Sequence, residues 1–404
     1  MRVAIAVEGT RGDVFPMLEL GLGLHSRGHD VAFCAPPDFR RPVESRGLAF
    51  HPVGREIRPY LEAEARSLHG GIVAMSRAGE RFFVEGVSRQ FRELLPAAEG
   101  AALVIAAGTQ MAASSVAERV GAAYRYVAYD PSMFRSAEHP PALLPLVDLP
   151  RWMNRGAWWM HDWMTRLRLV PAVDRERRAL GLPPARDLYR TILGMRPVLA
   201  AEPLLAPVAR DVKEVQTVGC LHRFDEGALP EKLRGFLDAG EPPVFIGFGS
   251  MTDPDPEAST RLVLDAVQRA GVRALVSEGW AGLARGALPA HVMAVGALSH
   301  ASLFGRVFAV VHHGGAGTTT TAARAGAPQI LIPHVLDQFH WAARIARLGL
   351  GPPPLRRRGL RAEALAAAMR ATLDNELLLE RAASIGRRLR RALSSRDDPA
   401  DVIV

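Results

Sequence analysis

The stretch over residues 307–333 constrains the fold of this chain more than any other. Its sequence, VFAVVHHGGAGTTTTAARAGAPQILIP, predicts an apolar strand ending at His312, a glycine turn, a helix over about 318–325 and a second apolar strand. Two apolar strands joined by a helix form a βαβ unit, which belongs to parallel sheets covered by helices. The stretch therefore predicts an α/β protein.

The glycine turn predicts a site for an anion. Glycines let the backbone approach a ligand closely, and the N–H groups and dipole at a helix N-terminus favour negative charge. The residues expected to form the site are His313, Gly314, Gly315, Gly317 and Thr318. The turn lacks the Lys-Ser/Thr ending of a P-loop, so we expect a diphosphate rather than a nucleoside triphosphate bound by that route.

Asp337 and Gln338 follow the second strand of this unit. Open parallel sheets place ligand-binding groups beyond the carboxyl ends of their strands. A carboxylate beside an amide suits vicinal hydroxyls, so the pair indicates a hydroxyl-rich ligand next to the diphosphate. The alternative for Asp337 is a cap of the helix expected over 341–348.

Alternating strands and helices run through both halves of the chain. Buried strands are expected at 3–7, 31–35, 103–107 and 124–129, and again at 244–248, 273–277, 292–295, 307–312 and 329–332. The proline-containing stretch before residue 220 shows no strong periodicity. The sequence therefore predicts two doubly wound, Rossmann-like parallel-sheet domains, at 1–205 and 220–374, with a linker at 206–219 and a last helical segment at 375–404.

Composition excludes several classes of protein. The two cysteines, Cys34 and Cys220, lie too far apart for metal-ligand spacing and are too few for a disulfide framework, which fits a reducing cytoplasm. The net charge of +8 comes with no recognisable nucleic-acid module, so no nucleic-acid partner is expected. Two interpretations of the positive charge stay open. The arginines form a solvated face or reflect codon bias, or they give a weak attraction to acidic lipid headgroups or to an anionic ligand.

Four motifs in order give the chain a family resemblance. They are Val7 to Pro16 (VEGTRGDVFP), Gly247 to Met251 (GFGSM), Ser277 to Trp280 (SEGW) and His312 to Gly351, which contains the glycine turn and the Asp337-Gln338 pair. Together they resemble nucleotide-sugar glycosyltransferases of antibiotic and natural-product biosynthesis. The resemblance is strongest with the vancomycin-type branch, and sterol glucosyltransferases share much of the pattern.

The resemblance implies the GT-B architecture, in which two such domains face a cleft. The N-terminal domain would bind the acceptor and the C-terminal domain the nucleotide-sugar donor, while the last helix, expected over 375–393, would pack back on the first domain. The implied reaction is an inverting transfer of a sugar from a dTDP-deoxyhexose or UDP-hexose to a hydroxyl of an apolar aglycone. The donor is a co-substrate, so no cofactor and no metal are expected.

Asp13 is the expected catalytic base. An acceptor hydroxyl must lose its proton as it attacks the anomeric carbon, and Asp13 lies in the turn after the first strand, at the carboxyl edge of the sheet. It also matches the aspartate that the antibiotic branch is proposed to use. The alternative is an N-terminal helix cap. Thr10 and Arg11 are expected near the phosphates or the acceptor, although Arg11 suits a surface ion pair equally well.

The resemblance extends the donor site beyond the glycine turn. Ser250 would close the diphosphate cradle, Trp280 would present an aromatic face to the nucleobase, and the backbone up to Leu298 would contact the base edge. Asp337 and Gln338 would bind the sugar. The competing interpretations are a satisfied core histidine for His313 and simple packing for Trp280.

A tryptophan-rich segment at 150–170 is the candidate for the acceptor-binding region. Helical spacing puts Trp152, Trp159 and Trp163 near one side, and three interpretations stay open: core packing, an acceptor wall formed by Trp159 and Trp163, or contact with a membrane. The oligomeric state is left as monomer or homodimer. The rival functions are a nucleotide-sugar epimerase on the same fold and a non-catalytic partner that activates another glycosyltransferase.

Overall fold

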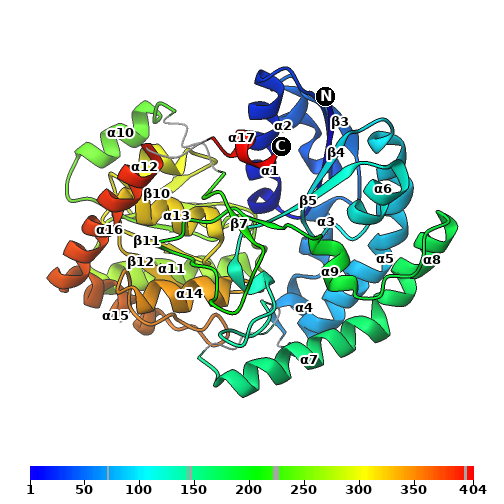
Figure 1. Cartoon of the computed structure of the whole chain (residues 1–404). Helices are drawn as coiled ribbons and strands as arrows, with labels where there is room; N and C mark the ends of the chain where they lie inside the picture. Colours follow the sequence, from blue (N-terminus) through cyan, green and yellow to red (C-terminus); the bar gives the residue numbers. More distant parts are fainter. Residues whose placement is uncertain (71, 143, 145–147, 222–226, 395–397) are drawn as a thin grey trace. The chain divides into compact units, whose positions relative to one another are not determined.

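The computed structural model describes residues 1–70, 72–142, 144, 148–221, 227–394 and 398–404. The chain divides into two compact units. The first comprises Met1–Arg223 together with Asp397–Val404, and the second comprises Phe224–Arg396. Both ends of the chain therefore belong to the first unit, as the N and C labels of Figure 1 show.

The first unit contains a seven-stranded parallel sheet in the order β3-β2-β1-β4-β5-β6-β7. Its strands are β1 (Arg2–Glu8), β2 (Asp30–Ala35), β3 (Ala49–Pro52), β4 (Leu103–Gly108), β5 (Ala123–Ala128), β6 (Val198–Leu199) and β7 (Gln216–Thr217). The central strand β1 is buried from Val3 to Glu8, because helices cover both faces of the sheet. This is why β1 reads as a continuous apolar run rather than an alternating one.

Helices of the first unit cover the sheet, and others pack on those helices. The helices are α1 (Arg11–Ser26), α2 (Arg40–Glu44), α3 (Ile57–Ala63), α4 (Ala65–His69), α5 (Ile72–Ala98), α6 (Ala113–Val120), α7 (Arg151–Arg168), α8 (Val170–Ala179), α9 (Leu188–Leu193) and α17 (Pro399–Ile403), with 3-10 turns at Pro37–Phe39 and Pro131–Met133. Helix α1 contributes Met17, Leu18 and Leu24 to the main core. Ala400 and Ile403 of α17 belong to the same core.

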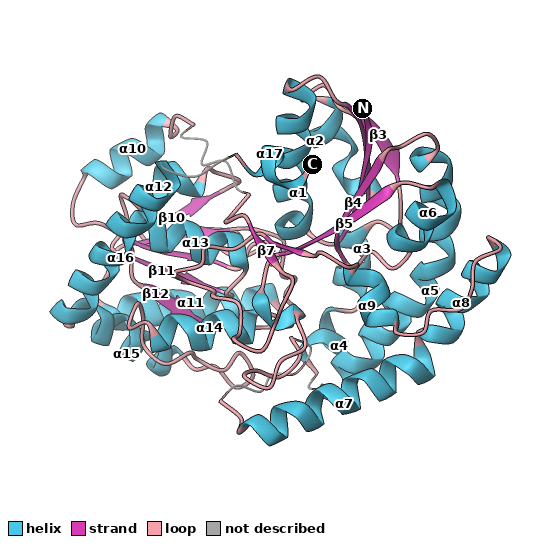
Figure 2. Ribbon diagram, in the orientation of Figure 1, coloured by secondary structure: helices cyan, strands magenta, loops and turns pink. Residues whose placement is uncertain are grey.

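The second unit contains a five-stranded parallel sheet in the order β10-β9-β8-β11-β12. Its strands are β8 (Val244–Gly247), β9 (Ala274–Ser277), β10 (Val292–Val295), β11 (Ala309–His312) and β12 (Gln329–Leu331). Its helices are α10 (Glu231–Asp238), α11 (Pro256–Ala270), α12 (His300–Phe304), α13 (Ala316–Ala325), α14 (Gln338–Arg347), α15 (Ala362–Leu373) and α16 (Glu376–Ser394). Helices lie on both sides of the sheet in Figure 2. Two apolar clusters result, one joining the sheet to α11 and α15 and the other to α10, α12 and α13.

The predicted fold class is confirmed, but the structure divides the chain differently from the predicted boundaries. The stretch 206–219 carries β7 and lies within the first unit. Helix α16, expected to pack on the first domain, belongs to the second unit and contacts α13. The approach is close, because a Cβ at Gly386 would lie 2.8 Å from the Cα of Gly326. The element that reaches the first unit is instead the shorter α17, which contacts α1.

Candidate functional site

Asp13 lies in the first turn of α1 and caps the helix that carries it. Its Oδ2 accepts hydrogen bonds from the Thr10 backbone N–H at 2.8 Å and from the Thr10 hydroxyl at 3.4 Å. Thr10 is the N-cap residue, so the two residues form a capping box. Asp13 therefore does cap the helix, as the alternative interpretation predicts. The capping box uses only Oδ2 and leaves Oδ1 outside it.

Glycines at the ends of two neighbouring strands make room for the Asp13 carboxylate: Gly9 follows β1, and Gly108 ends β4. A Cβ at Gly9, whose φ is +150°, would lie 2.2 Å from Oδ2. A Cβ at Gly108, at the end of β4, would lie 3.3 Å from Oδ1. Burial raises the pKa of Asp13 to about 6, although hydrogen bonds from Thr10 act in the opposite direction. The carboxyl group is thus poised to exchange a proton near neutral pH.

Glu8 is a second carboxyl group with a raised pKa, and it was not among the predicted site residues. It ends β1 fully buried, hydrogen-bonded by the side-chain amide of Gln90 and by the Thr109 hydroxyl at 3.4 Å. Burial raises its pKa to about 7, against the lowering effect of these bonds and of the Arg55 charge. The signal in the sequence was a charged residue closing an otherwise apolar strand.

Arg11 makes a contact that the sequence did not predict. It is exposed, and its guanidinium carbon lies 5.1 Å from the centre of the Phe15 ring one turn along α1. This is a cation–π contact rather than an acidic partner. The arginine therefore lies on the surface of the turn that also carries Thr10 and Asp13.

His312 and Gln329 fix the glycine turn of the second unit. Both side chains are completely buried. The Gly314 N–H donates to Nδ1 of His312 at 3.1 Å, so the ring proton is assigned to Nε2, which donates to Oε1 of Gln329 at 2.9 Å. Burial and the neighbouring His313 lower the pKa of His312 to about 3, so this ring stays neutral. His312 is thus a structural residue that holds the backbone of Gly314.

His313 lies between two glycine loops. A Cβ at Gly315 would lie 2.6 Å from its Nε2, and a Cβ at Gly249 would lie 3.0 Å from its Cε1. Its Nδ1 is buried with no hydrogen-bond partner among the described residues, so the ring is not a satisfied core histidine. Burial lowers its pKa to about 4. His313 is therefore a neutral ring, placed beside the start of α13.

The N-terminus of α13 presents backbone donors next to this ring. Gly315 is the N-cap residue and, in the described structure, provides no side-chain cap. The first N–H groups of an α-helix have no partner within the helix, so those of Ala316, Gly317 and Thr318 point beyond its end. Gly314 has a φ of +94°, and a Cβ there would lie 3.0 Å from the carbonyl oxygen of Gln338. The turn and the Asp337-Gln338 pair thus meet at one edge of the sheet.

Gln338 holds the loop before α14. Its side-chain oxygen accepts the N–H groups of His334 at 2.8 Å and Val335 at 3.1 Å, so it supports the loop backbone. Leu336 in this loop has a φ of +54°, which is strained for a branched residue. Asp337 occupies the N-cap position of α14, but its side chain makes no hydrogen bond that caps the helix among the described residues.

Two further loops complete this edge of the sheet. Ser250 is buried just after β8. The backbone N–H of Trp280, after β9, donates to the Gly249 carbonyl at 3.0 Å. Trp280 is half-buried, and Leu298 is a partly buried residue packed against an apolar cluster. The order of the sheet reverses between β8 and β11, and open sheets bind ligands at such a switch point. Ser250 and His313 follow these two strands.

The tryptophans of α7 have separate environments. Trp158 is buried and donates from Nε1 to the His139 carbonyl at 3.0 Å. Trp152, Trp159 and Trp163 are exposed at 72%, 70% and 52%. Core packing is therefore right for Trp158 and wrong for the other three.

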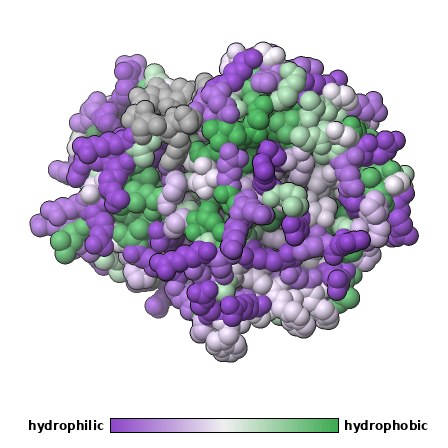
Figure 3. All heavy atoms as spheres, viewed as in Figure 1, coloured by the Kyte–Doolittle hydropathy of each residue, from purple (hydrophilic) through white to green (hydrophobic). Residues whose placement is uncertain are grey.

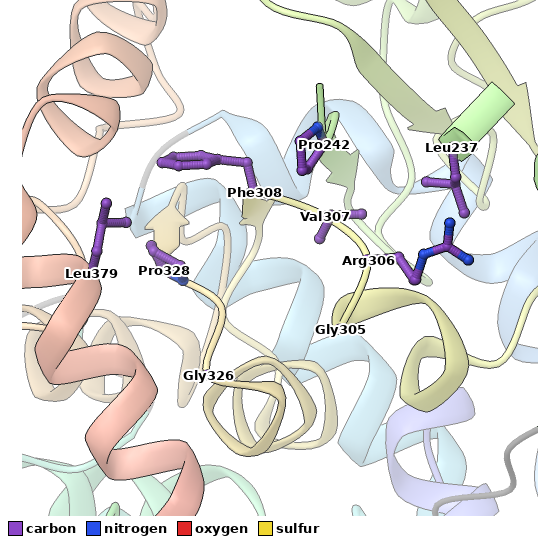
Figure 4. Close-up of a pocket in the computed structure, with 9 residues that line it drawn as sticks. All are labelled: Leu237, Pro242, Gly305, Arg306, Val307, Phe308, Gly326, Pro328 and Leu379. Carbon is purple, nitrogen blue, oxygen red and sulfur yellow. The ribbon is translucent and has the colours of Figure 1, made fainter. Parts of the chain in front are cut away.

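A pocket of about 430 Å³ lies at the opposite edge of the second sheet (Figure 4). Its lining includes Pro242, Phe308 and Pro328, which precede β8, β11 and β12, together with Leu379 of α16. Ligands of open parallel sheets bind at the carboxyl edge, whereas this pocket is at the amino edge. The candidate site is therefore the set of loops around His313 and not this cavity.

The described part of the chain shows neither a metal cluster nor a membrane-spanning helix. It contains no group of three or more histidine, cysteine, aspartate or glutamate side chains placed to hold a metal ion. None of the helices in the described part of the chain is both long and apolar enough to cross a bilayer.

Comparison with known proteins identifies related sequences over most of the chain. The family models "Glycosyltransferase family 28 N-terminal domain" and "Erythromycin biosynthesis protein CIII-like, C-terminal domain" match residues 3–135 and 262–404. Vancomycin aglycone glucosyltransferase of Amycolatopsis orientalis is 39% identical over 361 residues, which cover 87% of this chain and 85% of the relative. The dTDP-epi-vancosaminyltransferase of the same organism is 34% identical, with the same coverage of both chains. A sterol 3-beta-glucosyltransferase of Arabidopsis thaliana is 30% identical over 93% of this chain and 64% of its own length.

Solved structures share the fold at low sequence identity. The glycosyltransferase of kitacinnamycin superposes with a TM-score of 0.73 at 19% identity, covering 100% of this chain and 98% of that one. The spinosyn rhamnosyltransferase SpnG, solved with thymidine diphosphate, gives 0.67 at 19% identity, covering 100% and 99%. Both likenesses support the GT-B fold. On the strength of its relatives, this chain is a sugar-transferring enzyme that belongs to the family of nucleotide-sugar glycosyltransferases which includes vancomycin aglycone glucosyltransferase.

Proposed function

We propose that this enzyme moves one sugar from a nucleoside diphosphate donor to a hydroxyl of an apolar natural-product aglycone, with inversion at the anomeric carbon. The names of its relatives support a natural-product acceptor. They divide on the donor sugar, because one relative is named a glucosyltransferase and the other carries dTDP in its name, so both a dTDP-deoxyhexose and a UDP-hexose are candidate donors. Since these relatives are transferases, an epimerase and a non-catalytic helper are the weaker candidates.

Asp13 carries the mechanistic part of this proposal. In a single displacement, the acceptor oxygen bonds to the anomeric carbon, the bond from that carbon to the diphosphate oxygen breaks, and the hydroxyl proton passes to Asp13. A general base works best when its pKa lies near the working pH. Burial raises the pKa of Asp13 to about 6, so the ionised carboxylate predominates at neutral pH and remains basic enough to accept a proton.

The loops around His313 supply the groups that a leaving diphosphate needs. The N–H groups at the start of α13 offer dipoles in a fixed direction, and the Thr318 and Ser250 hydroxyls add donors. His313, neutral in the free enzyme, would donate a hydrogen bond from its ring. We assign the sugar hydroxyls to Asp337, with Gln338 holding its loop, and the nucleobase to Trp280 and the backbone near Leu298.

A product assay tests the transfer. The enzyme is incubated with dTDP-glucose or UDP-glucose and a panel of aglycones, and the products are examined by mass spectrometry. A mass gain of one sugar on an aglycone is the expected result, and the configuration of the new bond reports inversion. Conversion of the donor without an acceptor would indicate the epimerase instead, and no reaction of either kind with any donor would favour the helper.

The Asp13→Asn variant tests the base. Asparagine keeps an oxygen that can accept the Thr10 N–H but cannot take up the proton, so we expect nucleotide affinity to stay unchanged and kcat to fall by about 10²- to 10⁴-fold. Titration with dTDP or UDP and steady-state kinetics check the two halves of this statement. Full activity in the variant would remove Asp13 from the mechanism.

Three expectations from the sequence stay predictions. They are activity without a bound metal, a cytoplasmic location, and a monomeric or homodimeric state. Transfer that survives a chelator would support the first, and loss of activity restored by a divalent cation would contradict it.

A further inference from the structure

One side of α7 exposes several large apolar side chains to solvent. Trp152, Trp159 and Trp163 stand out from this side with Met160, which is 43% exposed, and Leu167, which is 56% exposed. These residues, with Arg155 and Arg166, are called the α7 face below. Single exposed apolar residues are ordinary, but a contiguous set of this size indicates a surface that binds something.

The helix itself is firmly held by its other side. Asn154 is buried and donates from its amide to the carbonyls of Ala137 at 3.0 Å and Leu149 at 3.2 Å. Trp158 is buried beside it. The exposure of the α7 face is therefore a property of a packed helix.

Helical geometry orders the residues of the α7 face. At 3.6 residues per turn, the three tryptophans fall within an arc of about 40°. Met160 and Leu167 flank this arc on one side, and Arg155 and Arg166 flank it on the other. The face thus has an aromatic centre, an aliphatic border and a cationic border.

The charge of α7 is strongly positive. It carries Arg151, Arg155, Arg166 and Arg168 against the single acid Asp162, which pairs with Arg135 at 2.9 Å. Arg168 pairs with Glu80 of α5. Arg155 and Arg166 make no ion pair with any described residue. Two arginines of the α7 face thus remain available to an anionic partner.

This combination fits the interface of an anionic bilayer better than other partners. Indole rings prefer the boundary between headgroups and acyl chains, and arginines reach the lipid phosphates from beside it. A second copy of the chain would offer these arginines no acidic partner, because the α7 face contains no acidic residue. Nucleic acid would use the tryptophans and arginines but would leave Met160 and Leu167 without an apolar environment. In Figure 3, the lower edge, where α7 runs in Figure 1, shows pale atoms among purple ones.

We propose that the α7 face docks this glycosyltransferase on anionic membrane surfaces. The helix lies in the plane of the interface, with the three indoles and Leu167 in the headgroup boundary and Arg155 and Arg166 on lipid phosphates. No part of α7 crosses the bilayer in this arrangement.

Vesicle binding tests the proposal. The full-length enzyme is sedimented with vesicles of phosphatidylcholine alone, or of phosphatidylcholine mixed equally with phosphatidylglycerol, at low and high salt. We expect binding to the anionic vesicles, a blue shift of tryptophan fluorescence on binding, and loss of most binding at high salt, where the Debye length shortens to about 3 Å. Equal binding to both vesicle types, or no binding to either, would overturn the proposal.

Two pairs of variants separate charge from apolar contact. Arg155→Gln with Arg166→Gln should weaken binding by about 25-fold, since each arginine near an anionic surface contributes about 1 kcal/mol. Trp152→Ala with Leu167→Ala should weaken it by about tenfold or more. Both double variants should keep their activity on a water-soluble acceptor.

The controls lie in the second unit. Arg356→Gln with Arg358→Gln removes the same charge from exposed positions, and Leu377→Ala removes a side chain that is 78% exposed on α16. These controls should bind vesicles like the unmodified enzyme. If they weaken binding as much as the α7 variants, binding depends on total charge or apolar area and not on the α7 face.

The other occupants of this face give different results. If the unmodified enzyme ignores vesicles and Trp159→Ala with Trp163→Ala raises the KM for a soluble acceptor, the face is an acceptor wall. If it is a dimer that the Trp152→Ala, Leu167→Ala variant converts to a monomer, the face is a contact between copies. Binding of an oligonucleotide through this face, without binding to anionic vesicles, would assign it to nucleic acid. Each of these outcomes rejects membrane docking.

Discussion

Asp13 performs two tasks that need different protonation chemistry. As part of the capping box it accepts the Thr10 N–H, and a carboxylate near a helix N-terminus is favoured in its charged form. Burial against Gly9 and Gly108 opposes that charge, and the raised pKa shows that burial is the larger effect. A capping position and a catalytic role are therefore compatible, and the first does not exclude the second.

The raised pKa of Asp13 predicts how activity and stability depend on pH. We expect kcat/KM to rise with pH to a plateau, with a midpoint near 6. Because the folded protein holds this proton more tightly than the unfolded chain, ionisation of Asp13 lowers the free energy of unfolding as pH rises from about 4 to 6. Above that range, Asp13→Asn should be more stable than the unmodified enzyme by about 1 to 2 kcal/mol, and near pH 4 this gain should vanish.

Urea unfolding at pH 4 and pH 8 checks the stability part. Glu99→Gln, which removes an exposed carboxylate from the same unit, should change stability little at either pH. A gain in Asp13→Asn that is the same at both pH values would show that its pKa is not raised in the folded protein.

The positions of residues in the fold were predictable where a place in the sequence fixes a place on the sheet. His313 and Asp13 both follow strands, so their placement at carboxyl edges needed only the strand assignment. The use of the Gln338 amide and the burial of Glu8 were not predictable in this way. Both depend on groups brought in by folding, which are the N–H groups of the loop before α14 and the Gln90 side chain of α5.

At the scale of the element, the turn between β11 and α13 depends on the pair formed by His312 and Gln329. Gln329→Leu should remove the acceptor for the His312 Nε2 proton and let the ring change tautomer, so that Nδ1 no longer accepts the Gly314 N–H. An unsatisfied buried donor costs about 1 to 3 kcal/mol. We expect nucleotide affinity to fall by about tenfold, with a smaller change in kcat, as measured by calorimetric titration and steady-state kinetics.

Thr319→Val is the matched control for this variant. It removes a fully buried hydroxyl from α13 that has no hydrogen-bond partner among the described residues. Nucleotide affinity should be unchanged in this variant. An equal loss of affinity in both variants would mean that any change in the packing of α13 disturbs the turn. The loss in Gln329→Leu would then not be due to the histidine tautomer.

Elements with a strong apolar run were predictable, and short or two-faced elements were not. Strands β6 and β7 have two residues each, which is too short for a period to be recognised. Helix α7 showed its tryptophan stripe in the sequence. The sequence did not show that Trp158 packs inward while the stripe itself stays in solvent, since both sides of α7 carry tryptophan.

For the whole molecule, α17 ties residues near position 400 to the first unit. Ala400 and Ile403 are buried in its core, and Arg27 of α1 pairs with Asp398 at 3.1 Å and with Asp401 at 2.6 Å. Deletion of residues 398–404 should lower the free energy of unfolding of the first unit by about 2 to 3 kcal/mol, because the core loses a buried isoleucine and its neighbours. Nucleotide binding by the second unit should persist.

Chemical denaturation followed by tryptophan fluorescence, together with nucleotide titration, measures both effects. Asp398→Asn with Asp401→Asn removes the ion pairs with Arg27, which are exposed and therefore contribute little. Asparagine keeps an oxygen for the Ala400 N–H that Asp398 accepts at the start of α17, so the helix cap is retained. If this control loses as much stability as the deletion, the stabilisation by α17 comes from its charges and not from its buried side chains.

The two-domain plan was predictable, but the identity of the crossing element was not. The amphipathic pattern of α16 shows that one side of the helix is buried, and it contains no information about which surface buries it. Leu378, Ala382 and Leu389 are buried in the structure, and α16 packs against α13. The helix that joins the first unit, α17, has only five residues, so its pattern carried no signal.

The position of α17 also fixes an order of events during synthesis. Its residues leave the ribosome only after the whole second unit has been made. Most of the first unit is translated much earlier, yet its core lacks Ala400 and Ile403 until that moment. Until residues 399–403 have been made, the part of α1 that contacts α17 stays uncovered, so the first unit obtains its full core only after the second unit has been translated.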